Sequence, residues 1–327
     1  MRTALALSLI LGTVVLFLVS LVIGPAEAGP GDSLAALFAD HGPLTMVMRE
    51  IRLPRAILAL LIGAGLGLAG AAMQGYLRNP LADPGLIGIS GTAALGAVLA
   101  IQTGFAGGWA LGLPLSALAG ALAGVFAILA LAGPRGGALA LILAGIALSA
   151  LAGALTSLVL NLSPNPFAAN EIVFWMMGSL ADRSWRDVMI AAPLILFGAL
   201  LLLRLGRGLD ALTLGEDAAG AMGIDLTRLR LALVIGTAAI IAGATAVAGV
   251  IGFVGLVMPH LLRRAVGARP GALLPAAALG GAMMLLAADI ATRLILPERD
   301  LKLGVLTALV GAPLFLRMIW RFRRDGF

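Results

Sequence analysis

Residues 52–90 read RLPRAILALLIGAGLGLAGAAMQGYLRNPLADPGLIGIS, and this stretch decides the class of the fold. Arg52 and Arg55 stand directly before an apolar run that is rich in Gly and Ala and long enough to cross a bilayer. A polar turn at residues 78–85 follows, and its Asn-Pro and Asp-Pro-Gly sequences interrupt helical structure before a second apolar run. The stretch therefore predicts two membrane-spanning helices joined by a tight turn.

The composition of the whole chain excludes a soluble globular protein. Hydrophobic residues make up 61% of the 327 residues and charged residues only 12%, whereas soluble domains carry about 25% charged residues. Roughly ten apolar runs approach the ~20 residues that cross a bilayer. We therefore predict an all-α integral membrane protein with ten transmembrane helices in a single domain, residues 1–327. The expected spans are residues 4–23, 56–76, 86–103, 109–132, 138–160, 188–205, 229–248, 250–266, 272–296 and 303–320.

The basic residues predict the orientation of these spans. With the N-terminus inside, fourteen basic residues fall inside and eight outside, as the positive-inside bias requires. The net charge of +6 is thereby explained by topology, and we expect a lipid bilayer and no nucleic acid as partner.

The first apolar run also resembles a signal peptide with a possible cleavage site at residues 26–28, Ala-Glu-Ala. Its apolar core of about 20 residues exceeds the usual ~7–15, which favours a retained first span. After it, Asp32 and Ser33 are expected to cap a short surface helix on the outer side.

The longest inside connection contains a segment with unusual chemistry, residues 210–225. Glu216 and Asp217 are expected in the first turn of a short helix, and Gly223 is expected to end it. Small residues give this helix a mildly apolar surface. It is either a surface helix at the membrane interface or a docking element that fits a cleft on a cytoplasmic partner.

Five segments carry a resemblance to a known family. They are RLPR at 52–55, NPLADPG at 79–85, LGEDA at 214–218, GFVGLVMPH at 252–260 and GVLTALVGAP at 304–313. In this order they resemble the permeases of binding-protein-dependent importers for iron–siderophore complexes, haem and cobalamin. The resemblance implies a homodimer with a central pathway, two ATP-binding cassette subunits beneath it and one binding protein outside. It also implies the bacterial cytoplasmic (inner) membrane.

The sequence agrees with a division of labour between subunits. No G-x-x-x-x-G-K-[ST] motif occurs, so ATP and Mg²⁺ are expected on the partner subunits. We expect no cofactor or metal on this chain, which has no Cys and two His, and no enzymatic activity of its own. Residues 65–70 formally fit G-x-G-x-x-G, but they lie in an apolar helix and are interpreted as a packing face, as is Gly120 to Gly124.

The resemblance also assigns residues to two partner contacts. The outer arginines Arg52, Arg55 and Arg293 match positions that pair with glutamates of the binding protein. Two alternatives are interfacial anchoring by Arg52 and Arg55, and pairing of Arg293 with Asp289 one turn earlier. The residues expected to seat in the ATPase groove are Leu214, Gly215, Glu216, Asp217, Ala218, Gly220 and Gly223.

The pathway and its substrate are harder to assign. Soft apolar side chains before Arg183 suit a large flat or macrocyclic ligand, although such a stripe is also typical of packing. Arg183 would attract carboxylates such as those of haem, and Lys302 adds a cation where many relatives have Glu-Leu-Pro instead of Asp-Leu-Lys at 300–302. Haem is favoured over ferric siderophores and cobalamin. The candidate pathway residues are Phe174, Trp175, Met176, Met177 and Arg183.

The predicted mechanism is alternating access driven by a partner ATPase. A weak similarity between the second and seventh spans, an odd number of crossings apart, indicates inverted-repeat character. One rival class is an ion-gradient secondary transporter, which would need midplane polar residues, and the spans hold few beyond Asp289. Another is an intramembrane enzyme, for which the sequence offers no nucleophile–base or metal constellation.

Overall fold

The computed structural model describes residues 3–24, 28–39, 41–109, 111–133, 137–295 and 301–324, and in these ranges it contains helices and no strand. The possible cleavage residues Ala26 and Glu27, and Asp300, lie outside the described residues. In chain order the elements are α1 (Thr3–Val22), α2 (Pro30–Ala36), α3 (Pro43–Met46), the π-helix η1 (Val47–Arg52), α4 (Leu53–Tyr76), the 3₁₀ helix η2 (Pro84–Ile87), α5 (Ile89–Gln102), α6 (Phe105–Gly108), α7 (Gly112–Ala132), α8 (Ala138–Asn161), α9 (Pro166–Met176), α10 (Trp185–Arg204), α11 (Gly206–Leu212), α12 (Glu216–Ala221), α13 (Leu226–Ala248), α14 (Val254–Arg263), α15 (Pro270–Ile295) and α16 (Leu303–Arg324).

Seven helices of the described residues are long and apolar enough to cross a membrane: α1, the continuous helix Pro43–Tyr76, α7, α8, α10, α13 and α15. Three shorter apolar helices are α5, α14 and the stretch Leu303–Met318 of α16. Each of the ten predicted ranges thus overlaps one of these helices, but the apolar stretch is shorter than a full span in three of them. The chain is an all-helical, multi-pass membrane protein.

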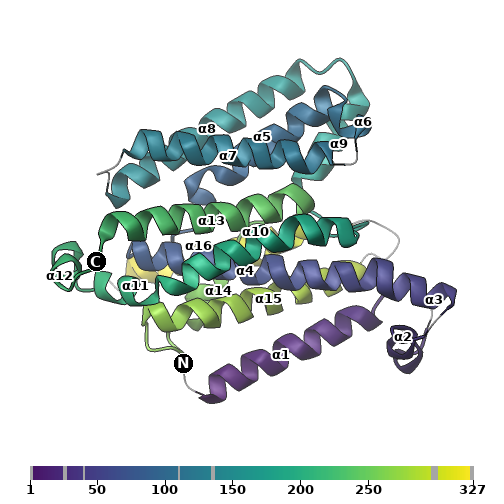
Figure 1. The fold of residues 1–327 in the computed structure, drawn as a ribbon, viewed down its shortest axis with the longest axis horizontal. Coiled ribbons are helices and arrows are strands. Elements are labelled where there is room, and N and C mark those ends of the chain that lie inside the picture. Colours follow the sequence, from purple (N-terminus) through teal and green to yellow (C-terminus); the bar gives the residue numbers. More distant parts are fainter. Residues whose placement is uncertain are drawn as a thin grey trace.

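The helices form a layered bundle (Figure 1). α4 and α15 pack along each other in its middle, α1 covers α15 on one side, and α10 and α13 cover α4 on the other. Beyond α13 lies a further layer of α5, α7 and α8. α11 and α12 lie at the end of the bundle where both chain ends are found, and α2, α3, α6 and α9 lie at the opposite end (Figure 1).

Glycines bring the central helices into close contact. A Cβ atom added to Gly63 of α4 would lie 2.8 Å from Cβ of Leu285 and 2.9 Å from Cα of Ala282 on α15. α5 and α7 meet in the same way, since a Cβ on Gly120 would lie 3.2 Å from Cα of Gly96. Small residues that let backbones approach are the usual basis of helix association in lipid, where packing replaces the hydrophobic effect. The predicted packing faces of α4 and α7 are confirmed.

Three local predictions need correction. α14 has 10 residues, about 15 Å of helix, and is shorter than the predicted span 250–266, because residues 249–253 are not helical. Gly249 and Phe253 there have φ of +71° and +68°. The outer surface helix begins at Pro30 after Gly29, so Asp32 lies in its first turn and is not its cap. The helix leading into α4 begins at Pro43, well before the predicted start of that span.

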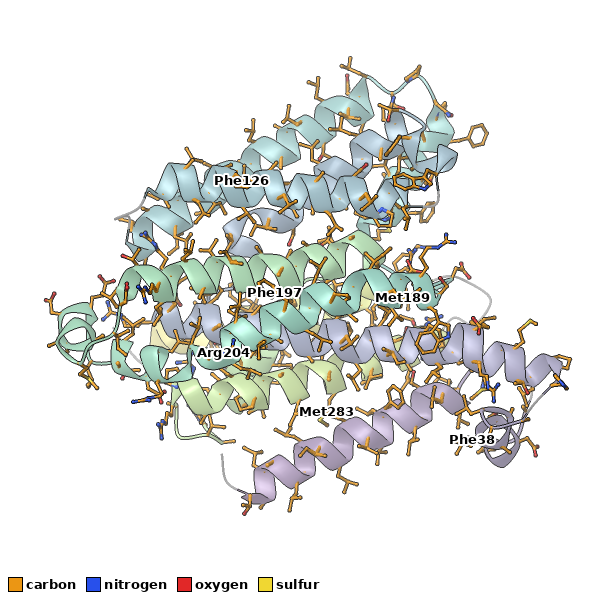
Figure 2. All side chains as sticks on the ribbon, in the orientation of Figure 1. Phe38, Phe126, Met189, Phe197, Arg204 and Met283 are labelled. Atoms are coloured by element: carbon orange, nitrogen blue, oxygen red, sulfur yellow. The ribbon has the colours of Figure 1, made fainter. Side chains whose placement is uncertain are left out.

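The flanks of the bundle are apolar. Phe126 of α7 and Phe197 of α10 are 70% and 52% exposed, and both lie midway along the bundle (Figure 2). With the many other exposed large apolar side chains they form a surface that is ordinary against lipid and unusual for a soluble protein. Met283 of α15 instead points to Gly12 of α1, where a Cβ would lie 2.6 Å from its methyl carbon.

Candidate functional site

We call the end of the bundle that carries α11 and α12 the inner end and the opposite end the outer end, after the predicted topology (Figure 1). At the inner end, α12 is a small helix that lies between two glycines. Gly215 precedes it with φ of +107° and Gly223 follows it with φ of +82°, backbone conformations that side chains with a Cβ rarely adopt. Glu216 and Asp217 lie in its first turn, as predicted. The Gly223 N–H donates to the Gly220 carbonyl at 2.9 Å and ends the helix, also as predicted.

One side of α12 is anchored and the other side is presented outward. Ala219 is fully buried, whereas Leu214 and Met222 at the two ends of the segment are 68% and 62% exposed. Glu216 and Asp217 are exposed as well. α12 projects from this end of the bundle (Figure 1). Its exposed side chains give the segment an apolar rim and two acidic groups.

At the outer end, the three predicted docking arginines form one cluster with a buried acid. Arg55 Nε donates to Asp289 Oδ1 at 2.8 Å, and Arg293 donates through Nη2 to Asp289 Oδ2. The Asp289 side chain is fully buried, and those of Arg55 and Arg293 are 19% and 8% exposed. The pairing of Asp289 with Arg293, proposed above as an alternative role, is present in the structure.

The same arginines close the end of α1. Arg52 Nη1 donates to the carbonyls of Leu21 and Val22 at 3.1 and 2.8 Å. Arg293 Nη1 donates to the carbonyls of Ser20 and Ile23 at 2.8 and 2.7 Å. Cationic donors satisfy the last carbonyls of a helix and its negative dipole end. The outer arginines are therefore pre-organised by contacts within this chain.

A mixed polar and apolar pocket of about 400 Å³ lies at the outer end, between the α5–α7 connection, α9 and the start of α10. The Arg183 guanidinium lines it, and its Nε is buried without a hydrogen-bond partner in the described structure. Glu171 and Asp187 line the same pocket. Asp187 already accepts hydrogen bonds from the backbone and hydroxyl of Ser184.

Of the four predicted pathway residues before Arg183, at positions 174–177, two are exposed and two are packed against other residues. Phe174 is 57% exposed, with Lys302 Nζ 5.5 Å from the centre of its ring, and Met177 is exposed too. Trp175 and Met176 pack against a buried cluster that includes Ile172. The structure thus brings Lys302, the departure from the family pattern, next to one of the candidate residues.

Close backbone contacts hold the candidate pathway residues 174–177 near two other segments. The Ser179 N–H donates to the Ala248 carbonyl at 2.8 Å, and the Gly304 N–H donates to the Gly178 carbonyl at 3.3 Å. A Cβ on Gly304 would lie 2.8 Å from the Val250 carbonyl oxygen. The stripe, the α13–α14 connection and the start of α16 therefore meet backbone to backbone at the outer end.

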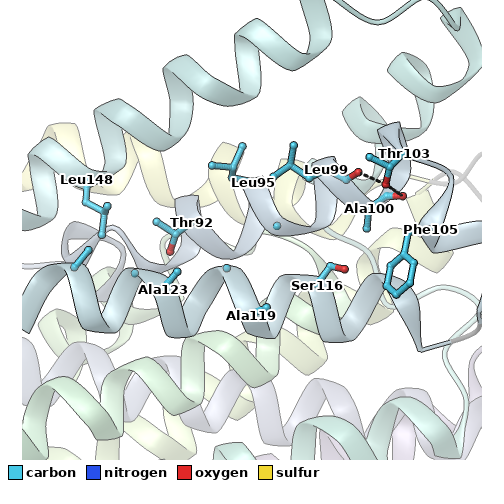
Figure 3. Close-up of a pocket in the computed structure, with 14 residues that line it drawn as sticks. Thr92, Leu95, Leu99, Ala100, Thr103, Phe105, Ser116, Ala119, Ala123 and Leu148 are labelled. Atoms are coloured by element: carbon cyan, nitrogen blue, oxygen red, sulfur yellow. Dashed lines mark hydrogen bonds between the residues drawn. The ribbon is translucent and has the colours of Figure 1, made fainter.

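A larger groove along α5, α7 and α8, with a volume of about 570 Å³, has a different chemistry (Figure 3). No charged residue lines it. The Thr92 and Thr103 hydroxyls donate to carbonyls of their own helix, the latter to Leu99 and Ala100 (Figure 3). A charged ligand finds no partner there, so the outer pocket is the better candidate for polar recognition. Among the described residues no group of three or more His, Asp or Glu is placed to hold a metal ion.

Two inner contacts were missed by sequence reasoning. Asp210 of α11 accepts from Arg269 Nε at 2.6 Å and from the Gly271 N–H at 2.7 Å. Asp83 accepts from the Gly85 N–H at 2.7 Å, and burial raises the pKa of Asp83 while this hydrogen bond opposes the rise. The Asp-Pro-Gly sequence signals the second contact locally, whereas nothing near Asp210 signals the first.

Comparison with known proteins places the chain in a family. Residues 12–321 match the model of the FecCD transport family. The hemin transport permease HmuU of Yersinia pestis is 39% identical over 97% of both chains, and the vitamin B12 import permease BtuC of Klebsiella pneumoniae is 38% identical over 95% of this chain and 92% of its own. The solved structure of a transporter assigned to the metal-chelate type of ABC transporters, in an inward-facing conformation, has a TM-score of 0.87 and 34% identity over 98% of this chain and all of its own.

These similarities decide between the classes considered above. ATP hydrolysis resides in partner subunits, and the secondary transporter and the intramembrane enzyme are set aside. The chain belongs to the FecCD transport family and is the permease subunit of a binding-protein-dependent ABC importer.

Proposed function

We propose that two copies of this chain form the membrane pathway of an ATP-driven importer for haem or another iron complex in the bacterial inner membrane. Each copy would cross the membrane ten times with inverted-repeat character, and the pathway would open alternately to the two sides. Support comes from the family, from the hemin permease among its relatives, and above all from Arg183. Arg183 lines a pocket at the outer end, and its Nε is buried without a hydrogen-bond partner in the described structure.

The substrate proposal rests on that guanidinium. A carboxylate of haem in this pocket would accept from the Arg183 guanidinium, and a charge-assisted hydrogen bond of this kind is about twice as strong as a neutral one. The exposed faces of Phe174 and Met177 nearby offer apolar surface for a macrocycle. Glu171 in the same pocket opposes an anionic ligand. Ferric siderophores and cobalamin are the alternative substrates.

Uptake by proteoliposomes that contain the complete importer tests this substrate. Arg183→Ala should lower haem uptake by about tenfold, the cost of one charged hydrogen bond, whereas Glu171→Gln should not lower it. Arg186→Ala is the matched control, because this exposed arginine is three residues away and does not line the pocket. Equal haem uptake by wild type and Arg183→Ala would refute the role of Arg183. Faster uptake of a siderophore or of cobalamin than of haem would identify the alternative.

The coupling proposal assigns residues 214–223 to the ATPase subunits. An exposed apolar rim and two acidic residues on an anchored helix suit insertion into a groove with basic groups. Glu216→Arg reverses one of these charges and should uncouple transport while the permease stays in the membrane. Thr227→Arg is the control, because it adds a positive charge at the same end but outside this segment. Full transport by Glu216→Arg would contradict the docking role.

The docking proposal assigns Arg52, Arg55 and Arg293 to carboxylates of the binding protein. Of the two arginines that hold Asp289, Arg55 has the more exposed side chain. We expect its other N–H groups to bind a carboxylate of the binding protein. Arg55→Glu should weaken binding of the binding protein by at least tenfold. Arg186→Glu makes the same charge change at an exposed arginine that is not part of the cluster. Equal weakening by both variants would show a general charge effect only.

A further inference from the structure

One helix connects the two ends of the bundle at which the proposed function places its partners. α15 has 26 residues, and a helix of that length is about 39 Å long. Its first turn lies at the end that carries α12, and its last two turns contain Asp289 and Arg293 (Figure 1). A single element therefore reaches from the region of α12 to the outer arginine cluster.

At the inner end, Asp210 joins this helix to α11. Its Oδ1 accepts from the Gly271 N–H at 2.7 Å and its Oδ2 from Arg269 Nε at 2.6 Å. The first N–H groups of a helix lack partners within the helix, and a carboxylate there also meets the positive end of its dipole. Asp210 thus caps α15 from a different helix, with a side chain that is only 21% exposed.

The backbones of the two helices also touch at this point. A Cβ added to Gly271 would lie 2.9 Å from the Gly206 carbonyl oxygen, and one added to Gly206 would lie 3.3 Å from Cα of Gly271. No side-chain layer separates α11 from the start of α15 here. A displacement of α11 must therefore move the N-terminus of α15 or break the Asp210 contacts.

α11 is continuous with the proposed ATPase contact. Three residues separate its end at Leu212 from the start of α12 at Glu216. Leu212 is buried in the same apolar core as Ala219 of α12. Both ends of the α11–α12 segment are thus anchored in the bundle, and force on α12 reaches Asp210 through a short connection.

The outer end of α15 is also held by hydrogen bonds to other helices. Asp289 holds Arg55 of α4, and Arg293 holds the Ser20 hydroxyl and the carbonyls of Ser20 and Ile23 at the end of α1. A carboxylate on a docked binding protein would compete with Asp289 for these guanidiniums. Docking would therefore act directly on the last turns of α15.

We infer that Asp210 is a positioning residue for energy coupling. Asp210 ties the N-terminus of α15 to α11. Through α15, docking of the binding protein at the outer arginine cluster then changes ATP hydrolysis beneath α12. This inference rests on the proposed function, since it needs the ATPases at α12 and the binding protein at the arginines. Where docking also changes the affinity of the ATPases for nucleotide, linkage requires nucleotide to change the affinity for the binding protein by the same factor. We expect this change to pass through the same contact.

The test uses the complete importer in nanodiscs, with its ATPase subunits and its substrate-loaded binding protein. Two quantities are measured: the stimulation of ATP hydrolysis by the binding protein, and the change in binding-protein Kd caused by a non-hydrolysable ATP analogue. In Asp210→Ala the ATPases should remain bound and basal hydrolysis should stay within about twofold of wild type. Stimulation should fall by about fivefold or more, the size of a typical coupling, and the nucleotide-dependent change in Kd should shrink.

Two further variants sharpen the result. Asp210→Asn keeps an acceptor for the Gly271 N–H and should give an intermediate loss, and it carries the test if the alanine variant does not fold into the membrane. Arg228→Ala removes an exposed ion pair with Asp225 at the same end and should behave as wild type.

Each outcome bears on a different claim. Undiminished stimulation and an unchanged Kd response in Asp210→Ala would overturn the inference alone. Loss of the ATPases from this variant would also overturn it, because Asp210 would then shape the docking surface itself. If the wild-type complex showed no stimulation by the binding protein, the proposed coupling function would fail before any variant was compared.

Discussion

Removal of the Asp289 carboxylate is expected to destabilise the permease strongly. In wild type this buried group accepts from Arg55 and Arg293, whose side chains are 19% and 8% exposed. Asp289→Ala would leave two nearly buried guanidiniums without their counter-ion. Breaking a buried pair in this way costs about 3–5 kcal/mol. Because Arg55 can turn partly to solvent, the lower value of about 3 kcal/mol applies.

Thermal unfolding of the purified permease at a fixed scan rate measures this loss. At about 2 °C per kcal/mol for a large domain, Asp289→Ala should unfold about 6 °C below wild type. Asp289→Asn keeps an acceptor and should lose less. Arg228→Ala removes an ion pair whose side chains are 88% and 51% exposed, and such pairs contribute at most about 1 kcal/mol. An unfolding temperature of Asp289→Ala no lower than that of Arg228→Ala would refute this account of the cluster.

Two other predictions concern packing and pH. Gly67→Ala should lower the unfolding temperature, because its Cβ would lie 3.0 Å from the Ala277 carbonyl carbon and overpacking costs about 1–3 kcal/mol. The control Gly153→Ala in α8, whose Cβ meets nothing within 4 Å, should leave the unfolding temperature unchanged. An equal decrease in both variants would contradict the contact. The raised pKa of Asp83 favours the folded state fully below the ordinary pKa of an aspartate, and this contribution is lost as pH rises through the folded pKa. Asp83→Asn keeps the hydrogen bond with the Gly85 N–H but cannot titrate. The unfolding temperature of this variant relative to wild type should therefore rise between about pH 4 and pH 8. A difference in unfolding temperature that does not change with pH would contradict this.

The positions of the helices could be predicted because bilayer thickness imposes them. A run of apolar residues that must cross the hydrocarbon core can satisfy its backbone only as a helix, so hydrophobicity alone locates α1, α4 and α13. Local chemistry likewise predicted the end of α12, since Gly223 has the positive φ that a glycine after a helix commonly adopts. These features depend on residues near one another in the chain.

The errors share a physical origin. The predicted eighth span was too long because the hydrophobicity of residues 250–253 does not reveal that Phe253 has a positive φ. The cap of α2 was misplaced because Asp32 was preferred over Pro30, although proline is common in the first helical turn. Arg55 was not linked to Asp289 because 234 positions separate them. Only the packing of α4 on α15 brings this pair together.

That packing also limits how the bundle can move. α4 and α15 meet through Gly63 and Gly281 with almost no side-chain layer between their backbones, and a close-packed contact of this kind does not deform continuously. The two helices must then tilt as one body, which keeps Arg55, Asp289 and Arg293 in fixed relation during any motion that starts at α12. α1 is attached to this body at its outer end by carbonyl contacts with Arg52 and Arg293. A binding-protein carboxylate that draws these arginines away would loosen α1 while α4 and α15 remain together, so α1 is the helix whose position should respond first to docking.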